Sequence, residues 1–357
     1  MIRRTLCFGA LLATLFSSSC IKDAPLNPEA DIDSFIVAKS QLTSDPFIDQ
    51  VNSKILLYLK QSAYENGVVP RIVPVPGAKV TPDLGDTLKF DQSTGLGLTA
   101  YTVTSQDGRY HKTYTVQVVN IGVWAWDFEH WVEQSPNRYM YPIEADSSSI
   151  WSSGNPGIAI ALPSNQKVPG SYPLRDTTDA YHGSHAAVLE TRGGTPLSSL
   201  VGIRLFAGSL FLGVFDSRFG LTNPLAATQF GQPYIGKPKS FTGYYKYTPG
   251  AVFQDKSGKP VAGATDSCSI YAVLYSGTTR LDATNIQTSD RIVAMAKLPD
   301  GGAKANYTRF NLPFVYYRPA TSQMMLAIVM SSSYMGDQYQ GAIGSRLTVD
   351  SLQIIHE

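Results

Sequence analysis

Aromatic residues stand beside polar residues in several stretches whose composition is typical of loops. A pyranose ring stacks its C–H groups on an indole or a phenol, while carboxylates, amides and guanidinium groups bind its hydroxyls. Residues of both kinds could together form a sugar-binding surface. The candidates are Trp131, Arg138, Tyr139, Tyr141, Trp151, Asn155, Tyr334, Asp337 and Tyr339. For Trp131 and Trp151 the alternative is that they anchor a loop or the core.

Few residues point to catalysis. Glycoside hydrolysis uses two carboxylates at a defined separation, and no motif selects a pair among Glu133, Glu144, Asp146 and Asp337. His182 and His185 have a spacing that zinc could use, but the sequence shows no third ligand near them. The sequence also contains no nucleophile elbow, phosphate-binding loop or dinucleotide fingerprint.

The first twenty residues have the order of segments found in a bacterial lipoprotein signal. Arg3 and Arg4 precede an apolar run that is too short to span a bilayer, and small residues lead to Cys20. We therefore expect cleavage before Cys20 and lipidation of its thiol. The alternative is an ordinary secretory signal that contains a cysteine. Residues 21–31 are polar and lack periodicity, which predicts a flexible tether.

Composition limits the location and the partners of the chain. Lys22 and Asp23 resemble the surface-export signal of Bacteroidetes lipoproteins, so we expect an outer-membrane lipoprotein at the cell surface, with a periplasm-facing protein as the alternative. Once Cys7 is removed and Cys20 is lipidated, Cys268 is the one remaining thiol, and no internal disulfide can form. The net charge is +1 without a cluster of basic residues, so we expect no nucleic-acid partner.

The elements that must position these side chains are strands. The chain has 30 Gly, 22 Pro and 20 Tyr and few helical periods, which is typical of all-β proteins. Within residues 32–120 the clearest unit is 101–119, where apolar and polar residues alternate on both sides of a turn at Gly108. This pattern predicts a hairpin with one buried face. Short strands at this spacing predict a small Ig-like β-sandwich.

Residues 121–357 contain further short apolar or alternating runs, bounded by Gly, Pro, Asn or Asp. Their number predicts a two-sheet jelly roll. Trp124 and Trp126 alternate at the start of the first run, so we expect both in the core. Residues 215–240 are rich in Pro and Gly, and we expect an ordered loop there that covers an edge or a face of a sheet.

Several blocks of this second part resemble a known family. They are FEHW, WSSGNPG, TTDAYHGSHAAVLET, FAGSLFLGVF, FTGYYKYTPG, CSIYAVLY and SSSYMGDQYQGAIGSRLTVDSL, and they occur in this order. Together they resemble the putative carbohydrate metabolism domain of Bacteroidetes lipoproteins, over about residues 124–357. The resemblance implies a jelly roll similar to carbohydrate-binding modules and a glycan context. It assigns no catalytic residues.

Jelly rolls of this type often bind calcium. Their first and last strands are neighbours, and many such modules hold a structural Ca²⁺ there with carboxylate and carbonyl oxygens. Glu129 and Asp350 match these strands, with Asp127 as an alternative ligand and either Asp179 or the backbone carbonyls of residues 180–185 as a third group. The other interpretation is that Glu129 and Asp350 accept hydrogen bonds from nearby backbone or pair with a cation such as Arg346.

The sequence thus predicts a lipid-anchored protein of the cell envelope that recognises a glycan or polysaccharide without catalysis. One alternative is a glycan-active hydrolase or lyase, which would bring carboxylates together in a deep cleft. Another is a structural or interaction subunit of an envelope protein complex, which would show an apolar patch or an open strand edge.

Overall fold

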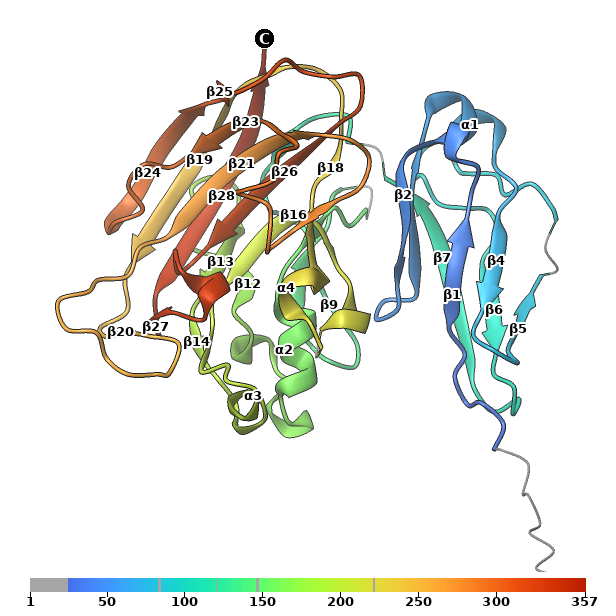
Figure 1. Ribbon diagram of the computed structural model, residues 1–357, viewed down its shortest axis with the longest axis horizontal. Helices are drawn as coiled ribbons and strands as arrows, with labels where there is room; N and C mark the ends of the chain where they lie inside the picture. Colours follow the sequence, from blue (N-terminus) through green and yellow to red (C-terminus); the bar gives the residue numbers. More distant parts are fainter. Residues whose placement is uncertain (1–24, 83–84, 120, 146–147, 221) are drawn as a thin grey trace, which may run out of the picture.

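The computed structural model describes residues 25–82, 85–119, 121–145, 148–220 and 222–357. These residues form two β-rich domains that lie side by side (Figure 1). Cys20 and the rest of the predicted signal segment lie outside the described residues. Among the residues that are described, no helix is both long enough and apolar enough to cross a membrane.

The N-terminal domain pairs a five-stranded sheet with a two-stranded one. The larger sheet has the order β2 (Leu42–Asp49), β3 (Lys54–Leu59), β7 (His111–Val118), β6 (Tyr101–Thr104) and β5 (Lys79–Thr81). The smaller sheet pairs β1 (Ile32–Ile36) with β4 (Arg71–Pro74). A 3₁₀ turn (Lys39–Gln41) precedes β2, and helix α1 (Gln61–Asn66) follows β3.

The hairpin predicted within residues 101–119 is confirmed. Strands β6 and β7 are antiparallel, with Tyr101 opposite Tyr114. Tyr101, Val103 and Tyr114 are buried, whereas Thr102 is only partly covered. Gly108 has a φ of +72° in the connecting turn, which a residue with a β-carbon would adopt at a cost. The alternation of apolar and polar residues therefore predicted both the pairing of these strands and the face that they bury.

The C-terminal domain contains two larger antiparallel sheets. The nine-stranded sheet follows the order β22 (Leu281–Asp282), β17 (Thr228–Phe230), β16 (Ser209–Phe215), β26 (Met324–Ser331), β21 (Ser269–Ser276), β23 (Ile292–Lys297) and β25 (Val315–Tyr316), with β11 (Trp151–Ser152) on β16 and β18 (Gln232–Tyr234) on β26. The six-stranded sheet follows the order β12 (Leu174–Thr177), β13 (Ala186–Glu190), β28 (Arg346–His356), β19 (Pro238–Thr248) and β24 (Lys304–Pro313), with β8 (Ala125–Trp126) on β28.

Short elements connect and cover these sheets. Three two-stranded pairs are β9 (Trp131–Glu133) with β10 (Met140–Pro142), β14 (Arg192–Gly193) with β15 (Leu205–Phe206), and β20 (Phe253–Gln254) with β27 (Gly341–Ala342). The helices are α2 (Asn155–Ala161), α3 (Pro196–Leu200) and α4 (Pro224–Ala227). The 3₁₀ turns are Ser164–Gln166, Pro169–Ser171, Ser217–Phe219 and Gly336–Gln338.

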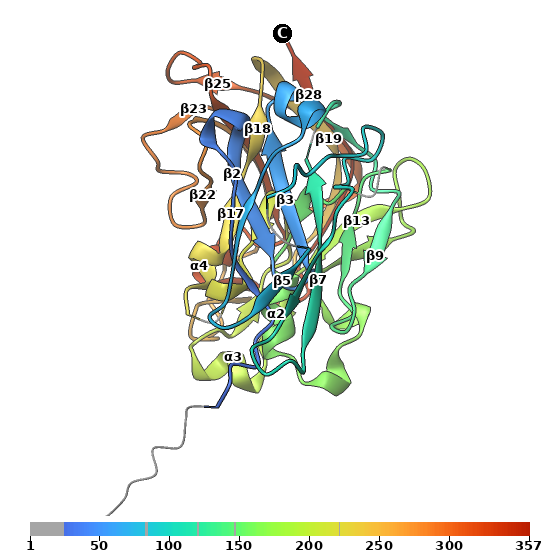
Figure 2. The same cartoon turned by 90° about the vertical axis from the view of Figure 1, so that its right-hand side faces the viewer.

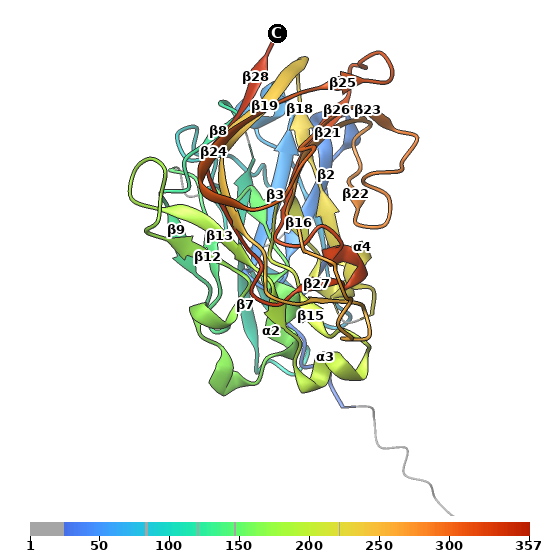
Figure 3. The same cartoon turned by 90° about the vertical axis from the view of Figure 1, so that its left-hand side faces the viewer.

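The two large sheets form two layers with the main core between them (Figure 3). Alternate residues of the nine-stranded sheet contribute to different clusters: Ile270 belongs to the main core, and Tyr271 to a second cluster on the outer face. Strands β21 and β26 are covered on both faces, which explains their continuous apolar sequence. The domain is the jelly-roll sandwich that its strand pattern predicts.

The first and last strands of this domain pair with each other, as expected for this fold. Leu352 lies opposite Trp126, and the Ile354 N–H donates to the carbonyl of Trp124 at 2.8 Å. Trp124 and Trp126 are buried, so their predicted place in the core is confirmed. Residues of 215–240 form the 3₁₀ turn Ser217–Phe219, α4, β17 and β18, and α4 packs against the nine-stranded sheet at β17 and β22.

The two domains contact each other directly through β2 and β3: β2 faces the C-terminal domain (Figure 1), and β3 lies beside it in the same sheet (Figure 2). The Ser44 hydroxyl donates to the carbonyl of Thr278 at 2.7 Å. The Arg280 guanidinium lies 4.7 Å from the ring centroid of Tyr58, which is fully buried. Because Tyr58 also belongs to the main core cluster, the cores of the two domains are continuous at this point.

Candidate functional site

A pocket of about 470 Å³ opens on the outer face of the nine-stranded sheet. Its floor consists of residues that point away from the main core, including Phe211, Phe230 and Tyr271. Its walls come from α2, α3, the region around α4 and the segment 333–339. We call this hollow the sheet pocket. The alternation of β16 and β21 creates it, since every second side chain of these strands must face outward.

Three of the predicted sugar-binding residues line the sheet pocket together: Tyr334, Asp337 and Tyr339. All three lie on the segment that follows β26 and contains the 3₁₀ turn Gly336–Gln338. The Tyr334 side chain is 53% exposed, so its ring is open to a ligand. Tyr339 is half-buried and ends the 3₁₀ turn with a φ of +57°, an uncommon conformation for tyrosine.

Asp337 dominates the electrostatics of this part of the pocket. Although its side chain is exposed, partial desolvation raises the pKa of the Asp337 carboxyl above its ordinary value of 3.8. Burial and then the charge of Asp337 raise the pKa of Tyr339, and the same two causes raise the pKa of Tyr271.

Two further polar residues complete this end of the pocket. The Lys297 ammonium donates to Gln287 Oε1 at 3.2 Å and lies 5.2 Å from the centroid of the Tyr334 ring. Gln287 lines the pocket itself. We call the lining side chains of this group the polar end of the sheet pocket: Tyr271, Gln287, Tyr334, Asp337 and Tyr339. Lys297 contacts two of them without lining the pocket itself. The polar end offers aromatic faces, one carboxylate and one amide.

A buried carboxylate holds the segment that carries these tyrosines. Asp266 Oδ2 accepts hydrogen bonds from the Ser333 hydroxyl at 2.6 Å, the Ala342 N–H at 2.7 Å and the Ser345 hydroxyl at 2.7 Å. Asp266 is 3% exposed. It therefore fixes both ends of residues 333–345, although it does not itself line the pocket.

Three other predicted residues are buried, which corrects the expectation that they are open to a sugar. Trp151 is 3% exposed and packs its ring at 5.1 Å from Trp126 in the main core. Tyr139 is 2% exposed. Asn155 is fully buried, and its side chain exchanges hydrogen bonds with the backbone of Leu174. Trp151 faces inward because β11 pairs with β16 and takes the alternation of that strand.

The remaining candidates lie on the β9–β10 hairpin and are not brought to the sheet pocket. The half-buried Trp131 donates from its indole nitrogen to the carbonyl of Phe128 at 2.7 Å. The Arg138 guanidinium donates to Glu133 at 2.8 Å, and Tyr141 is half-buried. The structure therefore divides the nine candidates among the pocket, the core and this hairpin.

Glu129 and Asp350, the predicted calcium ligands, both accept hydrogen bonds from the backbone of residues 181–185. Glu129 accepts from the N–H groups of Ser184 and His185 at 3.0 and 3.1 Å. Asp350 is fully buried and accepts from Tyr181 and His182 at 2.7 and 3.0 Å.

These contacts set the pKa values of the two acids. Desolvation opposes ionisation of Glu129, but the backbone hydrogen bonds from Ser184 and His185 outweigh it and hold its pKa below the ordinary value. For Asp350 burial is the larger effect and raises the pKa, which hydrogen bonds from His182 and Tyr181 partly offset.

The other two predicted ligands are also engaged with the protein. Asp127 accepts from the Glu129 N–H at 3.3 Å, and Asp179 pairs with Lys246. Within the described part of the chain, no three His, Cys, Asp or Glu residues are grouped so that they could hold a metal ion. This arrangement places N–H donors of residues 181–185 against both Glu129 and Asp350. It matches the alternative of backbone hydrogen bonding.

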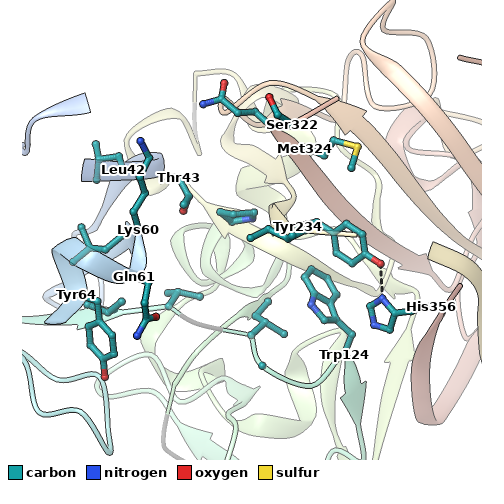
Figure 4. A pocket seen from close by; sticks show the side chains of 18 residues that line it. Leu42, Thr43, Lys60, Gln61, Tyr64, Trp124, Tyr234, Ser322, Met324 and His356 are labelled. Carbon is teal, nitrogen blue, oxygen red and sulfur yellow. Dashed lines mark hydrogen bonds between the residues drawn. The ribbon is translucent and has the colours of Figure 1, made fainter. Parts of the chain in front are cut away.

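A second hollow of about 610 Å³ lies between the two domains (Figure 4). The rings of Trp124 and Tyr234 meet edge to face with their centroids 4.8 Å apart, and the Tyr234 hydroxyl lies 2.8 Å from His356 Nδ1. Lys60 and Gln61 line the opposite wall. None of the predicted sugar-binding residues line this interdomain cleft. The packing of the two domains creates the cleft, and no local sequence pattern predicts such packing.

The sequence did not single out Tyr271 and Gln287 of the sheet pocket as ligand-binding residues. Tyr271 occurs in an apolar strand in which Tyr271, Val273 and Tyr275 alternate toward the outer face. Aromatic residues on the outward face of a central strand are the signal that would have located the floor of the pocket.

Comparison with known proteins agrees with this fold. The family model of the "putative carbohydrate metabolism domain" matches residues 127–355. A structure described as a "putative glycoside hydrolase" from Bacteroides thetaiotaomicron is 32% identical, with a TM-score of 0.83 and coverage of 94% of this chain and 99% of that chain. Another so described, from Bacteroides vulgatus, is 30% identical, with a TM-score of 0.59 and coverage of 65% and 98%. No curated protein matches the chain.

The family match covers more than half of the chain, and the first of these structures aligns over both domains. The blocks that carried the sequence resemblance lie within or next to the matched residues. The chain therefore belongs to the family of the putative carbohydrate metabolism domain.

Proposed function

We propose that this protein recognises glycans without catalysis at the sheet pocket. The observation that supports this most is the grouping of Tyr334, Tyr339 and Asp337 at one end of a pocket on a jelly-roll sheet. The exposed ring of Tyr334 offers a stacking face for a pyranose, and the carboxylate of Asp337 accepts hydrogen bonds from its hydroxyls. The family membership supplies the carbohydrate context.

Hydrolysis is the second candidate, because two similar structures are described as glycoside hydrolases. A glycosidase of the common type places an acid and a second carboxylate on opposite sides of the scissile bond. Among the described residues that line the sheet pocket, Asp337 is the one carboxylate. The geometry of this pocket therefore supports binding better than hydrolysis.

The test is glycan-array binding with residues 21–357, followed by titration calorimetry on any glycan that binds. We expect Tyr334→Ala and Asp337→Asn each to weaken binding by about tenfold, from loss of stacking or of a charge-assisted hydrogen bond. Tyr317→Ala is the matched control, since Tyr317 is exposed like Tyr334 but does not line the pocket. If both pocket variants bind like the wild type, the proposed site is wrong. Release of reducing sugar from a bound glycan would instead favour the hydrolase.

We also propose that the protein is a lipid-anchored lipoprotein of the outer membrane, from the signal pattern that ends at Cys20. A Cys20→Ser variant should lose incorporation of labelled fatty acid and appear in the soluble fraction. Protease treatment of intact cells then separates a surface location, with cleavage, from a periplasm-facing one, without cleavage. Labelled fatty acid on the Cys20→Ser variant would contradict the assignment.

A further inference from the structure

The sheet pocket has a second end that differs chemically from its polar end. This apolar end is lined by side chains from α2, α3, α4 and the floor of the sheet: Ile158, Leu197, Val201, Phe206, Phe211, Phe215, Leu225, Phe230 and Ile286. Phe211 and Phe230 are buried and meet edge to face with their centroids 5.0 Å apart. Leu197 and Val201 are 50% and 70% exposed, so they lie where this end of the pocket opens to solvent.

The hydroxyl groups around this part of the pocket are already occupied by the protein. Ser198 Oγ accepts from the Thr195 N–H at 2.9 Å, and its one proton has the carbonyls of Ile203 and Thr195 as acceptors at 2.9 and 3.1 Å. Ser209 Oγ accepts from the Gly154 N–H at 3.0 Å. Such serines are poorly placed to replace the water that a sugar hydroxyl loses on binding.

The same holds for three of the four remaining hydroxyl side chains along the floor and walls; the fourth, Ser269, lies on β21 two residues before Tyr271 of the polar end. Thr228 Oγ1 donates to the carbonyl of Pro224 at 3.2 Å, and Ser331 Oγ donates to the carbonyl of Ser333 at 2.8 Å. The Ser333 hydroxyl is bound to Asp266. Polar groups with capacity for a ligand are therefore concentrated at the polar end.

This segregation has a consequence for the ligand. A sugar ring placed at the apolar end would bury hydroxyls without hydrogen-bond partners, which weakens binding because each hydroxyl loses its water. A purely apolar molecule would leave the Asp337 carboxylate partly desolvated without a new partner. The pocket as a whole is complementary to a molecule that is polar at one end and apolar at the other.

We propose that the sheet pocket binds a saccharide that carries an apolar substituent, an acyl or aryl group attached to the sugar. The sugar lies against Tyr334, Tyr339 and Asp337, and the substituent lies between α3 and the phenylalanines of the floor. This inference rests on the proposed glycan recognition and adds the ligand class. The apolar group supplies binding free energy by burial, and the polar end selects the sugar.

The test compares glycosides that share a sugar and differ in the aglycone. Methyl, hexyl and phenyl glycosides of glucose, galactose, mannose and xylose are titrated calorimetrically into residues 21–357. Each buried methylene is worth roughly a fourfold gain in affinity. We expect the hexyl or phenyl glycoside of at least one sugar to bind at least tenfold more tightly than its methyl partner.

Substitutions at the apolar end and at the polar end of the pocket test this inference and the proposed function independently. Leu197→Asp and Val201→Asp place a charge at the apolar end, and each should weaken hexyl and phenyl binding about tenfold while methyl binding stays unchanged. Leu200→Asp is the matched control, because Leu200 lies on the same helix, is 82% exposed and does not line the pocket. Asp337→Asn should weaken all glycosides of the preferred sugar by the same factor.

Two results would overturn the inference. The first is equal affinity for the methyl and hexyl forms of every sugar, with Asp337→Asn still weakening both. This would support glycan recognition but show that an apolar substituent adds nothing to binding. Binding of hexyl glycosides that Asp337→Asn does not change would instead count against both the inference and the proposed site. The exposed positions of Leu197 and Val201 allow these variants to fold, and their melting temperatures check this.

Discussion

A β-carbon on Gly183 would lie 2.1 Å from Oε1 of Glu129. Gly183 also has a φ of +73°. The two residues therefore fit together only because residue 183 has no side chain, and Glu129 can then reach the N–H groups of Ser184 and His185. A methyl group added at residue 183 should therefore disturb both the backbone conformation and the position of the Glu129 carboxylate.

Gly183→Ala should lower the free energy of unfolding by about 2 kcal/mol, since it combines backbone strain with displacement of the Glu129 carboxylate. Gly263→Ala is the matched control, because Gly263 also has a φ of +73° but has no atom within 4 Å of an added β-carbon. It should cost about 1 kcal/mol. Urea denaturation measures both. Equal losses in the two variants would mean that Glu129 moves aside freely.

The same hydrogen bonds predict the response to a chelator. Because Glu129 and Asp350 already accept from backbone N–H groups, we expect EDTA to leave the melting temperature of residues 21–357 unchanged. Elemental analysis of the purified protein is the independent check. A fall of several degrees with EDTA, restored by added Ca²⁺, would show instead that the segment 179–185 rearranges around a metal ion and would support the calcium prediction.

Asp266 is expected to act on the pocket as a positioning residue. Asp266→Ala would leave the Ser333 and Ser345 hydroxyls and the Ala342 N–H without their acceptor, at a cost of about 3 kcal/mol. Hydrogen exchange of residues 333–345 should rise, and glycan affinity should fall with it.

The control for Asp266 is Asp255→Ala. Asp255 Oδ1 also accepts three hydrogen bonds, from Ser257 and Lys259, but the residue is only half-buried, so water can replace it. Its removal should leave binding unchanged. Binding that survives in Asp266→Ala at full strength would show that the tyrosines of the pocket are held by other contacts.

The raised pKa of Asp337 predicts a pH dependence of glycan binding. The ionised carboxylate is the better acceptor for sugar hydroxyls, so affinity should fall as pH falls through the pKa of Asp337. Desolvation raises this pKa above 3.8, and the fall should therefore begin at a higher pH than an ordinary aspartate would give. Calorimetry between pH 7 and pH 4 measures it, with Asp337→Asn as the variant whose affinity stays flat.

Through Asp337, the stability of the protein should not show the same pH dependence as glycan binding. A folded-state pKa above the unfolded value means that the native state binds the proton more tightly, so the Asp337 contribution to the free energy of unfolding rises as pH falls. Melting temperatures at each pH thus distinguish loss of binding from unfolding. A wild-type affinity that is constant over this range would exclude a role for the charge of Asp337.

Local patterns in the sequence were sufficient for the strands and for part of the pocket. The alternation around Gly108 predicted the hairpin of β6 and β7, which the structure confirms. This prediction succeeds because alternation and turn residues are local properties of the chain. The composition around Tyr334 and Asp337 marked a segment that lines a pocket, and its role in binding stays a prediction.

Predictions of side-chain burial and contacts were less accurate where the contacting residues are distant in sequence. Trp151 stands in a loop-like stretch, yet its burial is decided by the pairing of β11 with β16, some sixty residues later in the chain. The carboxylates of Glu129 and Asp350 were correctly expected near residues 179–185, but whether N–H or C=O groups face them depends on the path of that segment. Such orientations follow from tertiary packing, which composition does not encode.

The pairing of β8 with β28 places the entry and the exit of the C-terminal domain next to each other. A linker of a few residues could therefore join residue 357 to residue 124, and new termini could be opened in an exposed turn such as that at Gly263. Proximity of the two ends is also the condition under which one domain can be inserted into a loop of another protein. Adjacent ends thus suit the C-terminal domain to permutation or insertion in a host, provided that the β2–β3 surface with Tyr58, which completes its core, is kept or replaced.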